Sequence, residues 1–548
     1  MLRRHSGILA GIAGVFSLWA GIAVGGDEGK WLGVPTPEER QAAREKVKAS
    51  FYDLGLGSLP LAGPGKNDYP DIQGTTLHKY VENIVEFAEQ SRRDGNILWG
   101  RVSGTKYQHE TAEYMQKKFG EFGLENIHTE SFMRNAQWWP TKSRVSVILQ
   151  GANGKSEYVL RSAFPAPPSA SIAPGGLEAD VVDVGLGRPV DLAGRNVRGK
   201  IAVLRSVPLL GTIYLMYSGE TVPAKLAKMG AAAVITIIEA PGNSQTFLYD
   251  AFGETVPAFV IGGDDGDFLE DLIGRAEPSR LHIHMDLQTE YKPPASTENV
   301  IGVIPGTSDE YVVIMAHQDG WFDGAIDNAS GLATMLSLAQ HYAVESKRRK
   351  LRRNILFLAT AGHHMALGKQ HVSQTVDGYP STTASPGTAK FIELNPDILK
   401  KTVLALNCEH TASIATQTGG DTAMMATGGF FEQKLNTENA RTLAITNHSP
   451  MLLQFFRDAI DRYGLVVAGT TRHSPYGDAS VLQTKVPVVN LIETVGWYHS
   501  TADTPDLIPP QGLERTARAF AYFLDKVDAT PRADLERGAQ PAPTPNAP

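Results

Sequence analysis

The chain has 548 residues, a formal net charge of −8 and one cysteine, Cys408. This length exceeds what a single hydrophobic core usually organises, so we expect two or three domains. Its 42% hydrophobic and 20% charged residues are typical of a globular protein. No basic block could neutralise a row of phosphates, which argues against a nucleic-acid partner and favours a peptide or small-molecule partner. The lone cysteine excludes an intramolecular disulfide.

The first 25 residues have the pattern of a secretory signal peptide. Arg3 and Arg4 precede an apolar run over 8–24, and Ala23 and Gly25 supply the small residues that a signal peptidase accepts. We therefore expect residues 1–25 to be removed and the mature protein to be periplasmic or secreted. The apolar run approaches the length that spans a bilayer, so an uncleaved membrane anchor is the alternative.

Between this signal and residue 164 the sequence predicts a lead-in and the first part of a catalytic domain. Strands are expected after Leu124, where apolar and polar residues alternate, and a loop is expected over 100–105. The Pro- and Ala-rich end of the chain predicts a disordered tail over 531–548. Helices are predicted over 35–44, 77–92 and 111–122, the last two from apolar residues at helical spacing.

A middle block over 165–287 has short Val- and Ile-rich strands separated by Gly and Pro turns. It resembles the protease-associated domain in three ordered features, Val197-Arg198-Gly199-Lys200-Ile201, Gly230-Ala231 and Val256-Pro257. The resemblance implies a unit inserted into the catalytic domain that shapes or covers the substrate cleft, with 26–164 and 288–530 on either side of it. A small domain with a purely structural role is the alternative.

Residues that can bind metal follow the first strand after this block. The apolar run over 311–316 predicts a buried strand that ends at His317-Gln318-Asp319. A Gly-rich loop over 320–331 and a helix over 332–344 come next. Because open α/β sheets place ligands at the carboxyl ends of their strands, these side chains mark a candidate site.

This segment resembles the co-catalytic zinc exopeptidases, whose pattern is "H-x-D … G-A-x-D-N-x-S-G". The resemblance implies an α/β fold with a mostly parallel central sheet flanked by helices. It also implies that His317 binds one metal, that Asp319 supports this histidine, and that Asp327 bridges two metals.

The next element departs from the family pattern. After a strand over 354–360 the family carries "E-E-x-G-L", in which the first glutamate is the general base and the second a metal ligand. Here His363 and His364 replace both glutamates. His364 is therefore the expected ligand, and His363 is expected to accept a proton from water, since imidazole titrates near neutrality.

The remaining family elements are carboxylate and histidine positions after two further strands. Glu409 stands where the family has a ligand aspartate, and His410 is a possible substitute ligand. Strand alternation places Glu409 with Asn407 on one face and Cys408 on the other, which predicts a buried, packing role for the cysteine.

The last family element is "Y-H-t-x-x-D-t". It begins at Tyr498 and makes His499 a ligand of the second metal. Ala479 replaces the histidine of the family's "s-D-h" loop, and His473 and Asp478 are candidates to contact substrate or support the site.

The sequence as a whole predicts an exported metal-dependent exopeptidase with an altered centre. Zinc is the expected cofactor, as one or two ions, because imidazole and carboxylate ligands suit it. A non-haem iron enzyme that uses Asp327, His364 and His499 is one alternative, and an inactive binding protein is another. The choice between aminopeptidase and carboxypeptidase, and the oligomeric state, stay open. The expected ligands are His317, Asp327, His364, Glu409 and His499, and the expected catalytic residues are His363 and Asp319.

Overall fold

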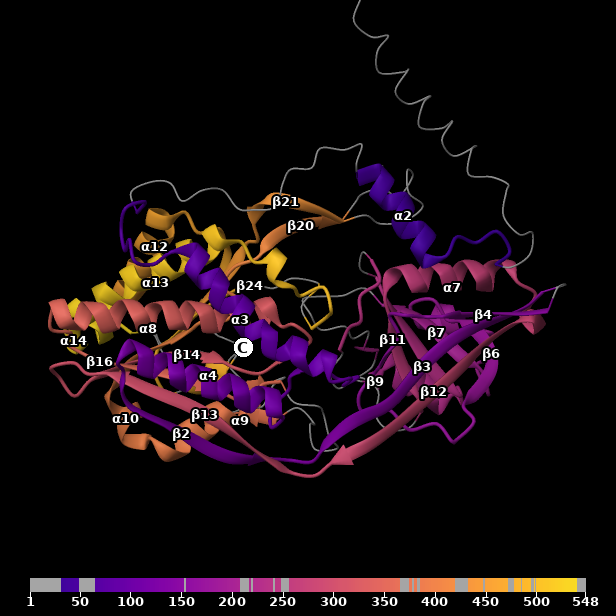
Figure 1. Cartoon of the computed structure of the whole chain (residues 1–548), viewed down its shortest axis with the longest axis horizontal. Helices are drawn as coiled ribbons and strands as arrows, with labels where there is room; N and C mark the ends of the chain where they lie inside the picture. The colour runs from indigo at the N-terminus through magenta and orange to yellow at the C-terminus, as the bar shows by residue number, and fades with distance from the viewer. Residues whose placement is uncertain are drawn as a thin grey trace, which may run out of the picture.

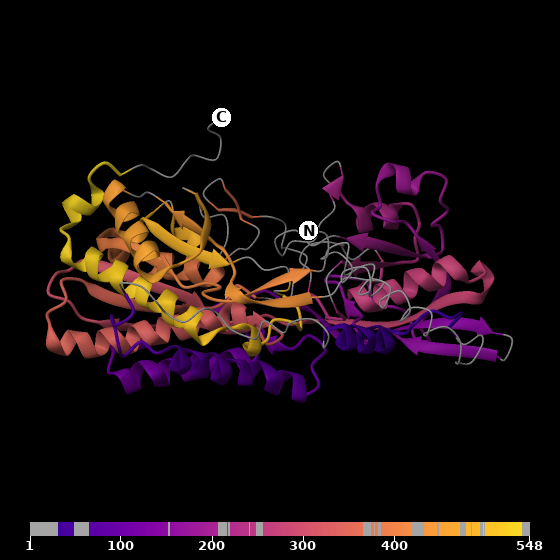
Figure 2. The same cartoon turned by 90° about the horizontal axis from the view of Figure 1, so that it is seen from above.

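The computed structural model describes residues 31–48, 65–151, 154–206, 216–217, 220–239, 242–247, 256–364, 374–376, 379–381, 385–418, 432–446, 449–471, 478–483, 485–493, 497 and 499–539. These residues form two eight-stranded sheets, which lie side by side along the long axis of the molecule (Figure 1 and Figure 2). The expected signal over 1–25 lies outside the described residues. Within them, no helix combines the length and the apolar character needed to cross a membrane.

The first sheet, called the catalytic sheet below, has four parallel strands at its centre, β16, β14, β19 and β24. Antiparallel strands join it on both sides, which confirms the predicted α/β class. In sheet order its strands are β2 (Glu125–Arg134), β13 (Ala295–Ile304), β16 (Asn354–Thr360), β14 (Tyr311–His317), β19 (Thr402–Asn407), β24 (Val488–Glu493), β22 (Arg441–Ile445) and β23 (Val467–Thr471).

Helices cover both faces of the catalytic sheet, which explains why its central strands read as continuous apolar runs. In β14, Ile314 packs into the core on one face, and Val313 and Met315 pack into the core on the other. The first face carries α3 (Gly74–Arg93), α4 (Lys106–Phe122), α8 (Gly331–Arg348), α12 (Pro450–Tyr463) and α13 (Pro510–Ala529), and the second carries α9 (Pro386–Leu394), α10 (Pro396–Lys401) and the 3₁₀ helix η3 (Asp478–Leu482).

Two local expectations were wrong. The segment over 100–105 is not only a loop, because β1 (Gly100–Arg101) pairs with β15 (Gly320–Trp321). The predicted tail begins with a short helix, α14 (Arg532–Glu536), whose Leu535 is buried in the core of the catalytic sheet. Residues 540–548 lie outside the described part of the chain.

The second sheet contains the strands of the middle block and also strands before it. β3 pairs with β12 and β4 pairs with β3, so this sheet starts well before residue 165. Its core is separate and packs α7 (Gly263–Arg275) against the strands. In sheet order the strands are β4 (Gly154–Val159), β3 (Gln137–Gly151), β12 (Leu281–Lys292), β6 (Leu177–Asp183), β7 (Ile201–Ser206), β10 (Ala233–Ile238), β11 (Ala258–Ile261) and β5 (Phe164–Pro165).

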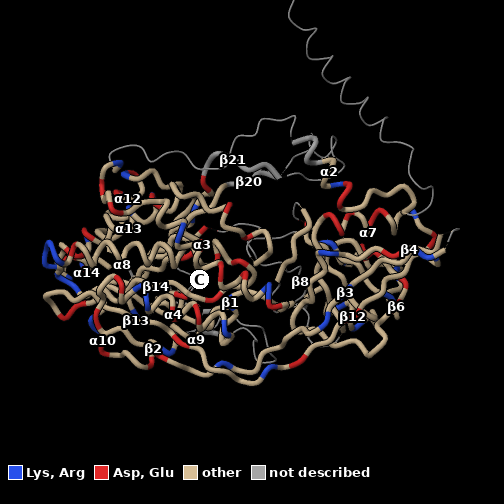
Figure 3. The backbone as a smooth tube through the Cα atoms, viewed as in Figure 1, with Lys and Arg blue, Asp and Glu red and all other residues tan. Residues whose placement is uncertain are grey.

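Two long antiparallel pairings connect the sheets. β2 pairs with β13 in the catalytic sheet, and the chain then continues directly into the β3–β12 pair of the second sheet (Figure 1). The lead-in helix α2 (Pro37–Lys48) also belongs to this second part, because Arg40 bonds to Asp271 on α7 and Trp31 packs edge-on against Phe268. Basic and acidic residues are interspersed over both parts of the molecule (Figure 3).

Candidate metal centre

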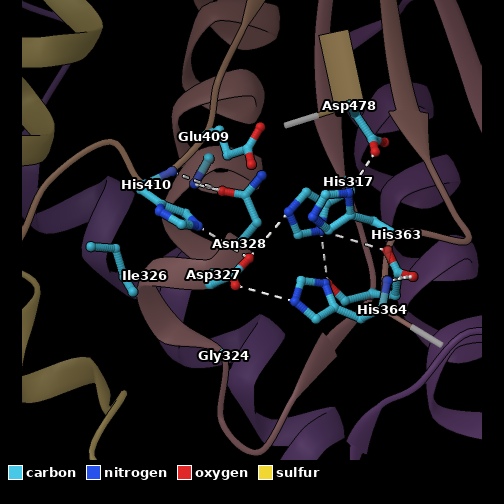
Figure 4. Close-up of polar contacts among 12 residues, drawn as sticks. His317, Gly324, Ile326, Asp327, Asn328, His363, His364, Glu409, His410 and Asp478 are labelled. Atoms are coloured by element: carbon cyan, nitrogen blue, oxygen red, sulfur yellow. Dashed lines mark hydrogen bonds and ion pairs between the residues drawn. The ribbon is translucent and has the colours of Figure 1, made fainter. Parts of the chain in front are cut away.

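Buried histidines and carboxylates gather at the carboxyl ends of the parallel strands (Figure 4). His317 is the last residue of β14, and it lies beside Thr360, the last residue of β16. His363 and His364 follow β16, and His410 follows β19 in the same way. This is the edge at which open α/β sheets hold ligands, because loops from several strands converge there.

Asp327 is the centre of this cluster, and four imidazoles surround its carboxylate. Its ring contacts are all with Nε2 atoms, at 2.8 Å for His499 and 3.1 Å for His364 on Oδ2, and at 3.2 Å for both His317 and His410 on Oδ1. The ligand atoms of Asp327, His364 and His499 lie within 4.8 Å of one another. Two imidazoles and one carboxylate at this spacing can hold a divalent cation.

The loop that carries Asp327 is fixed by hydrogen bonds from distant segments. Asp503 accepts two of them, from the backbone N–H groups of Ile326 at 2.7 Å and Asp327 at 3.2 Å. Arg101, which is fully buried, donates to the backbone oxygens of Gln318, Asp323 and Gly324. The sequence did not predict a role for Arg101. Its contacts join residues 217 to 223 positions apart, and such contacts leave no local pattern in the sequence.

His317 and His364 are supported from behind by Asp319. Its carboxylate accepts hydrogen bonds from the backbone N–H groups of His364 at 2.6 Å and Gly362 at 3.1 Å. Its backbone oxygen lies 3.0 Å from Nδ1 of His317. Asp319 thus links two strand ends.

A second group of ligand atoms, which shares His364 with the first, includes His363. Ring nitrogens of His317, His363 and His364 lie within 4.8 Å of one another. The rings of His317 and His363 are stacked, with centroids 4.2 Å apart. Nδ1 of His363 lies 2.8 Å from Oδ1 of Asp478, and Oδ2 of the same carboxylate accepts a hydrogen bond from Thr360.

The electrostatic environment keeps His364 neutral and Asp327 ionised. Burial opposes a positive charge on His364 and lowers its pKa to about 3, although Asp327 acts in the other direction. Burial also opposes the charge on Asp327, but the neighbouring positive charge of His410 favours it, and the pKa of Asp327 lies well below the ordinary value. Neutral imidazole and ionised carboxylate are the forms that bind metal.

Unpaired polar atoms in this cluster fit a cation. Nδ1 of His364 is buried and makes no hydrogen bond within the described part of the chain. Nε2 of His317 and Oδ1 of Asp327, also buried, lie 3.2 Å apart without hydrogen-bond geometry. Buried polar atoms are rarely left unpaired, and those that are need an explanation such as an ion. The donor set consists of imidazole nitrogen and carboxylate oxygen, which suits zinc.

The remaining expected residues lie outside these two groups. Glu409 belongs to neither, and its carboxylate instead accepts a hydrogen bond from Asn407. Cys408 is fully buried in the core, as expected for a packing residue. His473 and Tyr498 lie outside the described residues.

A segment of the second part of the molecule reaches the loop that carries His499. Phe247 donates its backbone N–H to the backbone oxygen of His499 at 2.8 Å. Gln245 and Thr501 exchange two hydrogen bonds, of 3.0 and 2.9 Å. The ring of Phe247 stacks on Trp321 with centroids 3.9 Å apart, and Trp321 packs nearly perpendicular to the rings of His364 and His499. No local pattern in the sequence predicts this contact.

Comparison with known proteins shows which family the segment around the centre resembles. The model of peptidase family M28 matches residues 299–524. Over this segment the chain therefore resembles peptidase family M28. This M28 segment runs from β13 into α13 and includes Asp327 and every histidine of the two ligand groups. The predicted resemblance to the zinc exopeptidases is confirmed.

Individual M28 relatives are distant. Mouse (Mus musculus) Carboxypeptidase Q is 24% identical over 266 residues, which are 45% of this chain and 53% of the relative. The chain thus spans about half the length of this relative. A peptidase M28 precursor from Shewanella amazonensis SB2B has a TM-score of 0.59 at 18% identity, covering 86% of this chain and 99% of that one. For BSAP, a zinc aminopeptidase from Bacillus subtilis, the TM-score is 0.55 at 17% identity, with the same coverage. At these identities the structures show the fold.

Proposed function

We propose that this chain is a metal-dependent exopeptidase that hydrolyses peptide or other amide bonds at a chain end. The observation that carries the proposal is the convergence of Asp327, His364 and His499, within 4.8 Å, inside the M28 segment. Zinc is the proposed cofactor, and the zinc aminopeptidase among the structural neighbours supports it. A peptide or small amide is the proposed substrate.

Each residue of the centre has a distinct proposed role. A divalent cation held there would polarise the scissile carbonyl and lower the pKa of water. Asp327 supplies the negative charge, and His364 and His499 supply neutral nitrogens. Asp319 and Asp503 hold these ligands in place. His363 either accepts a proton or binds the cation, and the two roles differ in whether its removal releases metal.

The experiment that tests this function measures hydrolysis of three matched dipeptides by the zinc-loaded protein. The dipeptides carry free ends, a blocked amino end or a blocked carboxyl end. An aminopeptidase cleaves the free and carboxyl-blocked forms, whereas a carboxypeptidase cleaves the free and amino-blocked forms. We expect His499→Gln to abolish cleavage and His128→Gln, which changes an exposed histidine on β2, to leave it unchanged. No cleavage of any dipeptide by zinc-loaded wild type would contradict the proposal.

A second candidate function follows from the same three ligands. Two histidines and one carboxylate are also the ligand set of non-haem iron oxygenases. Protein that retains iron and consumes oxygen, without cleaving dipeptides, would support this candidate. Protein that binds no divalent metal would instead indicate an inactive binding protein on the peptidase fold.

We further propose that the chain is exported and that the segment over 165–287 acts as a protease-associated unit. The signal-like pattern over 1–25 supports export, and sequencing of the mature amino terminus tests it. Contacts of Gln245 and Phe247 with the His499 loop support a role for this unit beside the site. An intact Met1 on cytoplasmic material would contradict export.

A further inference from the structure

We infer that His363 is a metal ligand, so that His317, His363 and His364 form a three-imidazole site for a late first-row divalent cation such as Zn²⁺. The inference rests on the proposed function, because it concerns the same centre. It differs from the proton-accepting role that the sequence predicts for His363. It also differs from the Asp327 group, because its three ligands are imidazoles, although Oδ1 of Asp327 lies 3.2 Å from Nε2 of His317.

The hydrogen bonds of two rings fix which nitrogen carries the lone pair. The ionised carboxylate of Asp478 can only accept, so His363, 2.8 Å away through Nδ1, must donate from that atom. Nδ1 of His317 faces a backbone oxygen at 3.0 Å and must donate as well. In the neutral form both rings therefore keep their lone pair on Nε2.

Ring nitrogens of the three histidines lie close enough together to share one cation. His317 and His363 stack with their ring planes 20° apart, and a nitrogen of His364 lies in the same group within 4.8 Å. His317 and His364 are fully buried, and His363 is 9% exposed. Nδ1 of His364 makes no hydrogen bond among the described residues, and neither does Nε2 of His317, which lies 3.2 Å from Oδ1 of Asp327. A cation satisfies such convergent lone pairs, whereas a proton satisfies only one of them.

The surroundings of His363 match those of a metal-binding histidine. Ligand histidines usually donate their second ring N–H to a carboxylate or backbone oxygen, which fixes the ring orientation. Asp478 does this for His363 and is itself fully buried and bonded to Thr360. The backbone oxygen of Asp319 does the same for His317. Three imidazoles without a carboxylate favour zinc, nickel or copper over magnesium, calcium or manganese.

The test is a titration of metal-free, full-length protein with Zn²⁺ by calorimetry, and with Co²⁺ by visible absorption. His363→Gln keeps an N–H that can reach Asp478 but removes the imidazole. We expect this variant to bind Zn²⁺ more than tenfold more weakly than wild type and to change the Co²⁺ spectrum. The exposed His128→Gln should leave both unchanged.

A second variant covers the case in which His363→Gln does not fold. Asp478→Asn leaves His363 in place but weakens its support, which typically costs 10- to 100-fold in metal affinity. Unchanged Zn²⁺ affinity and Co²⁺ spectrum in either folded variant, with hydrolysis alone reduced, would overturn the inference and leave the proposed function intact. A wild type that binds no Zn²⁺ would overturn both.

Discussion

A single carboxylate, Asp327, holds the centre together at the residue scale. It lies within 3.2 Å of four imidazole nitrogens and is 2% exposed, so its charge is poorly screened by water. His410 shows the strength of this charge. Burial alone would lower the pKa of His410, but Asp327 raises it to about 9. The same charge would attract a divalent cation.

Replacing Asp327 by asparagine tests this reading. The change removes the negative charge but keeps the volume, so we expect Zn²⁺ affinity to fall more than 100-fold and hydrolysis to disappear. Asp397→Asn, which changes an exposed carboxylate on α10, is the control and should bind Zn²⁺ as wild type does. Equilibrium dialysis with metal analysis measures both. Wild-type affinity in Asp327→Asn would contradict the central place of this residue.

Among the residues of the centre, the sequence could predict those that belong to a motif. His317, Asp327, His364 and His499 follow strands in a recognisable pattern, and the structure brings them together, although their roles stay predictions. Glu409 was also named but lies in neither ligand group, and its carboxylate accepts a hydrogen bond from Asn407. Long-range contacts such as those of Arg101 have no local signature in the sequence.

The element that links the second part of the molecule to the centre is the short segment 245–247. It pairs with the loop over 499–501, and its Phe247 stacks on Trp321. Trp321 in turn packs nearly perpendicular to the rings of His364 and His499. This segment therefore positions His499 through its backbone and His364 through packing. Strands and helices over 311–316, 332–344 and 354–360 were predictable from apolar patterns, and the structure confirms them. The pairing of β3 with β12 was not, because it joins residues over 130 positions apart.

Two matched leucine substitutions test the role of this segment. Phe247→Leu and Phe391→Leu each remove a buried ring. Phe247 lies beside the centre, and Phe391 packs on the second face of the catalytic sheet, the face that carries α9. Both should lower the free energy of unfolding by about 1 to 3 kcal/mol. Only Phe247→Leu should also weaken Zn²⁺ binding, as measured by calorimetry. Equal Zn²⁺ affinity in the two variants would show that the segment has only a packing role.

Glu493, the last residue of β24, gives the sheet edge a pH dependence. Burial raises the pKa of its carboxyl to about 7, although Arg441 and Ser413 oppose this. The folded pKa lies above the ordinary 4.5, so the unfolded chain loses its proton first as the pH rises. This carboxyl therefore contributes full stability below about pH 4.5, and the contribution falls until about pH 7.

Glu493→Gln removes this titration while keeping the size of the side chain. Relative to wild type, the variant should become more stable as the pH rises from 5 to 8. Urea unfolding at both pH values measures the difference in free energy of unfolding between the two proteins. The same difference at pH 5 and pH 8 would mean that Glu493 titrates as it does in the unfolded chain.

At the scale of the whole molecule, the centre lies where the catalytic sheet contacts segment 245–247 of the second part. A bound metal should stabilise the folded protein. A ligand that binds only the folded state at 1,000 times its Kd adds about 4 kcal/mol. We therefore expect Zn²⁺ to raise the Tm of metal-free wild type by several degrees and a chelator to reverse it. Asp327→Asn should show no such shift. Identical Tm values with Zn²⁺ and with chelator would argue against a specific site.

The central claim is that the strand ends of the catalytic sheet hold metal on Asp327, His364 and His499. Anomalous diffraction at the zinc edge, from crystals of zinc-loaded protein, tests it most directly because it locates the ions themselves. We predict an anomalous peak bounded by these three side chains, and a peak or ligand contact at His363 if the three-imidazole site is also filled. Zinc found only elsewhere on the protein, or nowhere, would contradict the account.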